Sequence, residues 1–302
     1  MDDRVAAVAA AAHARAEGDL VVERALSAGC RLVEVLTDAA SPSALVQNID
    51  ASIPVYAAHA DVRKTLTGMG VALDIMGLFE RPSPLKLDEL LATAHHLLVV
   101  EDVDNPTNIG AIIRSAAAFG IDGVILDRNS ADPLARRALR VSMGTAFSMR
   151  YSRVIDASST LIALRDAGYI VCGLTPRSDA LNIREVGAGL PQDAKVAIVL
   201  GSERAGLSPE ALAAVNFMVK IPMADGVDSL NVAAAAADET RAVGFVGDGL
   251  DVGVVHGGQL EHPGRHLAMP ARPPRAQQRL FVRHPFGLHE QVAEGRVHLV
   301  RN

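Results

Sequence analysis

The chain of 302 residues has no tryptophan, only 3% aromatic residues and two cysteines. With so few aromatic side chains, the core must be built from alanine, valine, leucine and isoleucine. Cys30 and Cys172 lie in unrelated segments without metal-ligand spacing, so we expect reduced, buried thiols and no metal site. No apolar run approaches the roughly 20 residues of a membrane helix, and the acidic N-terminus lacks the basic segment of a signal peptide. These absences predict a cytoplasmic protein without a membrane partner.

The net charge of −6 does not by itself indicate a polyanionic partner. Nucleic-acid binding depends on local basic patches rather than on the charge of the whole chain. The densest such patch contains Arg136, Arg137 and Arg140, with Arg136 and Arg140 spaced one helical turn apart. These arginines are candidates for contacts with RNA phosphates, and a solvated helix face explains them equally well.

The length is sufficient for two domains of the usual ~100–200 residues. In residues 1–90 we expect a small α/β unit with a helix over residues 1–16 and strands at 31–37 and 53–57. The prolines of 82–84 indicate a linker at its end.

Strands and helices alternate through the second part of the chain, residues 95–244. Continuous apolar runs predict strands at 97–101, 123–126, 169–174, 195–200 and 217–221, with helices at 109–119, 133–143 and 158–167. This alternation favours an α/β fold with a parallel sheet covered on both faces, which binds ligands beyond the carboxyl ends of its strands. Residues 245–302 are rich in Gly, Pro, His and Arg, which favours a disordered tail or an out-of-frame reading of the gene.

The first motif, Asn105-Pro-Thr-Asn-Ile-Gly-Ala-Ile-Ile-Arg114, predicts a helix that begins near Asn108. Apolar residues at helical spacing form its buried stripe, and Arg114 projects off that stripe. A guanidinium there can reach a phosphate or hydroxyl beside the sheet edge. Asn108 can cap the helix or offer its amide to a substrate. Taken alone, the motif is also consistent with a capped helix that carries one solvent-exposed arginine.

Two further motifs follow predicted strands. Gly201-Ser-Glu-Arg-Ala-Gly206 comes after a strand that ends at Leu200, and its glycines allow a close approach of backbone to ligand. Ser208 and Pro209 then indicate the start of a helix. In the third motif, Ile221-Pro-Met…Ser229-Leu-Asn-Val232, Asp228 or Ser229 is expected to cap an alanine-rich helix.

The order and context of the three motifs resemble the SpoU/TrmH family of RNA ribose 2′-O-methyltransferases, over roughly residues 95–235. The resemblance implies methyl transfer from S-adenosylmethionine to a ribose 2′-hydroxyl of structured RNA, either tRNA or rRNA. It also implies a homodimer and a parallel α/β sheet whose C-terminal part forms a trefoil knot. Residues 1–90 resemble the small RNA-binding domain that often precedes this catalytic domain.

The resemblance assigns roles to residues. It implies a catalytic group of Asn108, Arg114, Glu203, Ser229 and Asn231, a cofactor site of Leu200, Gly201, Ile221, Met223 and Leu230, and no metal. The family is often described with the arginine matching Arg114 as the base. A guanidinium is a poor proton acceptor, so we expect Arg114 to orient the ribose and stabilise the developing alkoxide.

Two other classes of protein remain as alternatives. An RNA-binding protein of the same fold that has lost methyl transfer would fit the irregular tail. A nucleotide-dependent dehydrogenase is much weaker, because no GxGxxG turn follows the first strand of the sheet.

Overall fold

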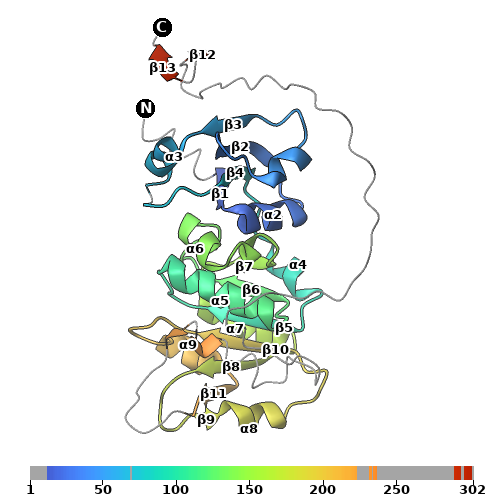
Figure 1. Cartoon of the computed structure of the whole chain (residues 1–302). Helices are drawn as coiled ribbons and strands as arrows, with labels where there is room; N and C mark the ends of the chain where they lie inside the picture. The colour runs from blue at the N-terminus through green and yellow to red at the C-terminus, as the bar shows by residue number, and fades with distance from the viewer. Residues whose placement is uncertain are drawn as a thin grey trace, which may run out of the picture. The chain divides into compact units, whose positions relative to one another are not determined.

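The computed structural model describes residues 12–68, 70–222, 231–232 and 234–236, and the backbone of the strands β12 (His289–Ala293) and β13 (Arg296–Val300). Residues 1–246 and 247–302 form separate compact units. Figure 1 shows the four-stranded sheet of the first unit in blue and its larger, seven-stranded sheet further along the chain. No helix in the described ranges has the length and apolar character needed to cross a membrane.

The N-terminal sheet has the strand order β1-β4-β2-β3. Its strands are β1 (His13–Glu17), β2 (Leu32–Asp38), β3 (Val55–Ala58) and β4 (Ile75–Glu80), and its helical segments are α2 (Asp19–Ser27), η1 (Ala44–Asn48) and α3 (Ala60–Thr67). The strands expected at 31–37 and 53–57 are confirmed as β2 and β3. The helix expected over residues 1–16 is wrong from residue 13 onward, because these residues pair antiparallel with β4, a partner some sixty positions away. Residues 1–11 lie outside the described ranges.

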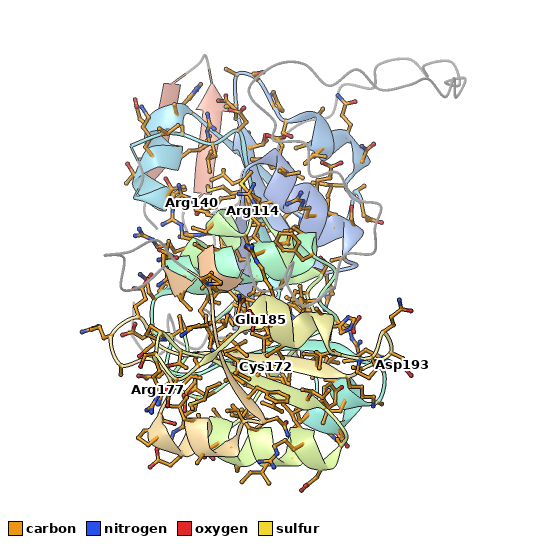
Figure 2. The ribbon with its side chains drawn as sticks, turned by 90° about the horizontal axis from the view of Figure 1, so that it is seen from below. Arg114, Arg140, Cys172, Arg177, Glu185 and Asp193 are labelled. Carbon is orange, nitrogen blue, oxygen red and sulfur yellow. The ribbon has the colours of Figure 1, made fainter. Side chains whose placement is uncertain are left out.

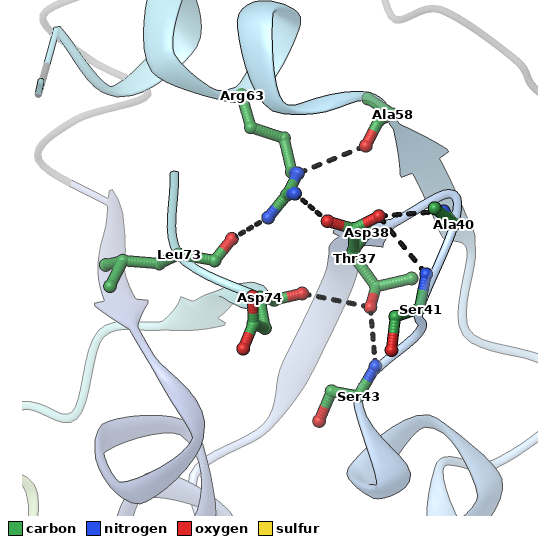
Figure 3. Close-up of polar contacts among 9 residues, drawn as sticks. All are labelled: Thr37, Asp38, Ala40, Ser41, Ser43, Ala58, Arg63, Leu73 and Asp74. Carbon is green, nitrogen blue, oxygen red and sulfur yellow. Dashed lines mark hydrogen bonds and ion pairs between the residues drawn. The ribbon is translucent and has the colours of Figure 1, made fainter. Parts of the chain in front are cut away.

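A buried arginine holds this sheet together at the ends of β2 and β3 (Figure 3). Arg63 of α3 is only 2% exposed. Its Nε donates to the carbonyl oxygen of Ala58 at 3.1 Å, and its terminal nitrogens donate to the Leu73 carbonyl and the Asp38 carboxylate. A buried charge is tolerated when it is paired and hydrogen-bonded in this way. Arg63 therefore stabilises the fold and is not a candidate for binding RNA phosphates.

The second sheet is entirely parallel and has the order β7-β6-β5-β10-β8-β11-β9. Its strands are β5 (His96–Val100), β6 (Gly123–Leu126), β7 (Tyr151–Arg153), β8 (Ile170–Leu174), β9 (Leu181–Asn182), β10 (Val196–Leu200) and β11 (Phe217–Lys220). β6 and β10 are buried along their whole length, as expected for a parallel sheet covered on both faces. The predicted parallel α/β sheet is confirmed, whereas the short strands β7 and β9 were not predicted.

Helices connect these strands. They are α4 (Leu87–Leu91), α5 (Pro106–Ala118), α6 (Arg136–Val141), α7 (Ala157–Asp166), α8 (Ile183–Ala188) and α9 (Pro209–Ala214), with the 3-10 turn η2 (Thr145–Phe147) after α6. Of the predicted helices, α7 agrees closely, α5 begins earlier than the expected 109–119, and α6 is shorter than the expected 133–143. The sequence patterns do not predict the bounds of α4, α8 and α9, although Ser208 and Pro209 indicate the start of α9.

The start of α5 differs from the prediction. Asn105 caps the helix by accepting a hydrogen bond from the Thr107 backbone nitrogen at 2.9 Å, and Pro106 occupies the first turn. Asn108 therefore lies inside the helix and is not its cap. The helix ends before Gly120, whose φ of +71° is the left-handed conformation that glycine favours after a helix.

The expectation of a disordered or out-of-frame tail at residues 245–302 falls mostly outside the described residues. Within that segment β12 and β13 pair antiparallel, with His289 opposite Val300 and Ala293 opposite Arg296. The origin of the tail stays a prediction.

Candidate active site

The carboxyl ends of three neighbouring strands, β10, β8 and β11, surround a cavity of about 540 Å³. Open α/β sheets bind ligands at such ends. Its wall contains apolar side chains as well as polar and charged groups. The residues of this wall include Leu174, Thr175, Leu200, Gly201, Ile221 and Val232.

The loop after β10 is folded too tightly for any side chain at Gly201. A Cβ there would lie 2.3 Å from the carbonyl carbon of Gly206 and 2.4 Å from the backbone nitrogen of Leu207. Gly206 closes the turn by donating its N–H to the Ser202 carbonyl at 3.0 Å, with φ of +69°. The turn therefore presents backbone rather than side chain to this part of the cavity wall.

A carboxylate joins this loop to the end of β5. Glu101 accepts hydrogen bonds from the backbone nitrogen of Ser208 at 2.9 Å and from its hydroxyl at 2.7 Å. Ser208 in turn caps α9 by accepting from the Ala211 backbone nitrogen at 3.0 Å, ahead of Pro209. The predicted helix start at Ser208 and Pro209 is confirmed, and the loop is held at both its ends.

Three residues from the three motifs meet through hydrogen bonds. The amide nitrogen Nδ2 of Asn231 donates to Glu203 Oε1 at 2.7 Å and to Asn108 Oδ1 at 3.4 Å. Asn108 is 6% exposed on α5, and Glu203 also lines the cavity. The arrangement brings one carboxylate and two amides together next to the cavity wall that the Gly201–Gly206 turn forms.

The arginines of the first motif and the basic patch occupy α5 and α6. Arg114 is exposed and lies off the buried stripe of α5, as its spacing predicted. Figure 2 labels it together with Arg140, which is exposed on α6. Arg137, also exposed, donates from Nε to the Thr107 hydroxyl at 2.7 Å, one residue before Asn108. A basic surface therefore adjoins the start of α5.

Arg136 lies in a different environment from its two neighbours. Its Nε donates to Glu17 Oε1 at 2.5 Å, and the side chain of Glu17 is fully buried. The guanidinium thus links α6 to β1 of the N-terminal sheet. Arg136 is therefore engaged in an ion pair and partly buried, whereas Arg137 and Arg140 are exposed. Contact of the three arginines with RNA phosphates stays a prediction.

The residues expected at the cofactor site fall into two groups. Leu200, Gly201 and Ile221 line the cavity, while Met223 and Leu230 lie outside the described residues, as does the catalytic candidate Ser229. Sequence reasoning missed the wall that follows β8, which contributes Thr175, Pro176 and Arg177. The strand itself was predicted, but its position beside β10 and β11 is a property of the sheet order.

Comparison with known proteins identifies the family. The model of the SpoU rRNA Methylase family matches residues 95–237. An uncharacterized tRNA/rRNA methyltransferase of Mycobacterium tuberculosis is 34% identical over 248 residues, which cover 78% of this chain and 83% of that protein. The chain belongs to the SpoU/TrmH family of RNA methyltransferases.

Solved structures of RNA methyltransferases share the fold. An AdoMet-bound rRNA methyltransferase from Sinorhizobium meliloti superposes with a TM-score of 0.66 at 25% identity, covering 78% of this chain and 87% of that one. An RNA 2′-O ribose methyltransferase superposes with a TM-score of 0.62 at 27% identity, covering 76% and 87%. Both superpositions cover more of the chain than residues 95–237, the segment that the SpoU family model matches.

Proposed function

We propose that this protein transfers a methyl group from S-adenosylmethionine to a ribose 2′-hydroxyl of tRNA or rRNA. The observation that carries the proposal is the hydrogen-bonded group of Asn108, Glu203 and Asn231 on the edge of the glycine-walled cavity. Membership of the SpoU/TrmH family supports RNA methylation, and the likeness to a ribose 2′-O-methyltransferase supports the hydroxyl as acceptor.

The cavity fits S-adenosylmethionine in size and chemistry. Its volume of about 540 Å³ lies within the range of small-molecule sites. Leu200, Ile221 and Val232 provide apolar surface for the faces of an adenine, and the turn at Gly201 brings backbone groups close enough to bind its edge. When bound, S-adenosylmethionine supplies an electrophilic methyl group on a positively charged sulfur.

The catalytic candidates of the three motifs would orient the acceptor and stabilise charge. A guanidinium is a poor proton acceptor, so Arg114 acts as a donor to the ribose and to the negative charge that develops on its oxygen. Asn231 holds Glu203 in place through its amide, and Asn108 supports that amide from the other side. Alignment of the reacting groups by such fixed contacts is a large source of rate acceleration.

The exposed arginines of α6 extend this site toward the RNA backbone. α5 and α6 pack closely, since a Cβ on Gly110 would lie 2.6 Å from the carbonyl oxygen of Ala138. Arg137 and Arg140 thereby lie on a helix held directly against the one that carries Asn108 and Arg114. We infer that they bind phosphates of a structured RNA, and that residues 1–90 contribute to its selection.

Two architectural features of the family are part of the proposal. We infer a trefoil knot, which is supported by the return of the chain after β11: Val232 and Ala236 are buried in the same core cluster as Leu98 and Leu200. We also infer a homodimer, which light scattering on the purified protein would test. A monomer at working concentration would remove the dimer from the proposal.

Incubation of the purified protein with methyl-labelled S-adenosylmethionine and total RNA tests the function. We expect label in RNA that survives alkaline hydrolysis at the modified position, because a 2′-O-methyl group blocks cleavage there. Absence of label from every RNA, with binding of the cofactor intact, would favour an RNA-binding protein without turnover. Comparison of 2′-O-methyl maps from cells with and without the gene would then identify the nucleotide.

A further inference from the structure

A pair of cations lies on the side of the cavity formed by β8 and β11. Arg177 follows the end of β8, and Lys220 is the last residue of β11; both line the cavity. The two strands are neighbours, with Val219 opposite Leu174, so the pair belongs to one edge of the sheet. The proposed catalytic residues do not use either cation.

Arg177 is oriented by a neighbouring carboxylate. Its Nε donates to Asp179 Oδ1 at 3.0 Å and its Nη2 to Oδ2 at 2.9 Å, which leaves Nη1 outside the bidentate pair. The pKa of Asp179 is lowered, chiefly by the hydrogen bonds from Arg177 and also by the charge of Lys220. A guanidinium fixed in this way is prepared to bind a further planar anion.

Lys220 fastens the same loop from the other strand. Its Nζ donates to the carbonyl oxygen of Ser178 at 2.7 Å, between Arg177 and Asp179. Together the two cations and the one carboxylate leave this edge with a positive charge. A ligand anion is therefore attracted to it.

The wall formed after β10 carries charges of both signs, Glu203 and Arg204, and Arg204 faces Asp104 at 3.9 Å. On the wall formed after β8, Arg177 and Lys220 outnumber the single carboxylate of Asp179, so a ligand carboxylate is attracted there. Figure 2 shows Arg177 well separated from Arg114 and Arg140, the arginines assigned to the RNA. The cation pair therefore fits a small anionic group inside the cavity better than the RNA backbone.

We propose that Arg177, oriented by Asp179 and supported by Lys220, binds the methionine carboxylate of S-adenosylmethionine and selects for a cofactor that carries it. This inference rests on the proposed function, because it names one contact of that same cofactor. Arg177 is a binding residue and takes no part in the chemical step.

Titration calorimetry with two ligands tests the contact. S-adenosylhomocysteine has the amino-acid carboxylate, and 5′-methylthioadenosine keeps the nucleoside and sulfur but lacks it. We expect Arg177→Ala to weaken S-adenosylhomocysteine about tenfold or more, the usual loss for a charged hydrogen bond, and to change 5′-methylthioadenosine by less than about twofold. Arg177→Lys should fall between wild type and Arg177→Ala, because it keeps the charge and loses the fork.

Arg31→Ala is the matched control. Arg31 also forms an exposed ion pair with a carboxylate, Glu80, but in the N-terminal sheet. Arg31→Ala should leave the affinities for S-adenosylhomocysteine and 5′-methylthioadenosine unchanged. Thermal unfolding of each variant checks that it is folded. Lys220→Ala should weaken S-adenosylhomocysteine in the same direction as Arg177→Ala, by a smaller factor.

The outcomes separate the inference from the proposed function. Equal losses for both ligands in Arg177→Ala, or no loss for either, overturn the carboxylate contact while leaving the methyltransferase in place. An unchanged cofactor affinity with a raised KM for RNA would assign Arg177 to the RNA instead. Failure of the wild-type protein to bind either ligand would overturn the proposed function, and the carboxylate contact with it.

Discussion

The amide of Asn231 donates to Glu203 Oε1 at 2.7 Å and to Asn108 Oδ1 at 3.4 Å, so a single side chain joins three segments of the chain. Glu203 comes from the turn after β10, and Asn108 from the first turn of α5. Because Asn231 is the shared donor, its replacement affects both partners at once.

Asn231→Asp is expected to damage methyl transfer more than Asn231→Ala. The alanine variant loses a donor to a carboxylate, which costs about tenfold or more in rate. The aspartate variant adds a second carboxylate opposite Glu203, and like charges at this distance repel. The double variant Asn231→Asp with Glu203→Gln restores one donor and one acceptor in reversed order. It should bind S-adenosylhomocysteine better than Asn231→Asp alone; equal binding by the two would contradict this account.

Arg114→Ala should leave the affinity for S-adenosylmethionine nearly unchanged, because the cofactor is expected to rest on the Gly201 and Ile221 walls. The rate of methyl transfer should fall by roughly 10²-fold or more, the order for removing one electrostatic stabiliser. Arg114→Lys should restore little of it. Single-turnover kinetics with calorimetric binding provide the measurement. A variant with near-normal turnover would remove Arg114 from the mechanism.

Gly201→Ala should abolish cofactor binding while leaving most of the fold intact. A Cβ at this position would overlap the backbone of Gly206 at 2.3 Å, so the turn has to open into the cavity wall. Gly189→Ala is the matched control, since its nearest neighbour would be an ordinary 3.5 Å away. Calorimetry with S-adenosylhomocysteine should show wild-type binding for Gly189→Ala and none for Gly201→Ala. Retained affinity in Gly201→Ala would show that the turn can move without consequence.

Arg136 and Arg137 are adjacent on α6 but should behave differently when replaced. Arg136→Ala leaves the buried Glu17 with Arg15 as its remaining ion partner, at 3.1 Å. The side chain of Arg136 is 31% exposed, so we expect about 2 kcal/mol of destabilisation, below the range for fully buried pairs. Arg137→Ala should cost less than about 0.5 kcal/mol and instead weaken RNA binding. Urea unfolding and RNA titration at several salt concentrations distinguish them; the reverse pattern would refute the assignment.

The start of α7 should make the stability depend on acid pH. Asp156 accepts from the Ser159 backbone nitrogen at 2.8 Å, and this bond, with those from the Ser159 and Ser158 hydroxyls, lowers the pKa of Asp156. The folded pKa lies below the unfolded one, so the stabilisation is present above the unfolded value of about 4 and is lost as pH falls through the folded value. Asp156→Asn keeps a capping oxygen without the titration. Its deficit in melting temperature relative to wild type should be seen at neutral pH and shrink as the pH falls below the unfolded value of about 4; a deficit independent of pH would contradict the prediction.

Local patterns determined much of this protein. The apolar runs of β5, β6, β8 and β10 required a buried parallel sheet, because such strands cannot face water on either side. The stripe on α5 and the Ser208-Pro209 start of α9 are likewise properties of neighbouring residues. Even the cap at Asn105, which was missed, is a local signal, since proline follows it directly.

Tertiary structure alone decided which of these pieces meet. The contact of Asn108 with Asn231 spans 123 positions, and that of Glu17 with Arg136 spans 119. The sheet order placed β8 between β10 and β11 and thereby brought Arg177 to the cavity. Periodicity reports how one segment buries its own face; it carries no information about which distant segment covers that face, because that choice depends on packing of the whole core.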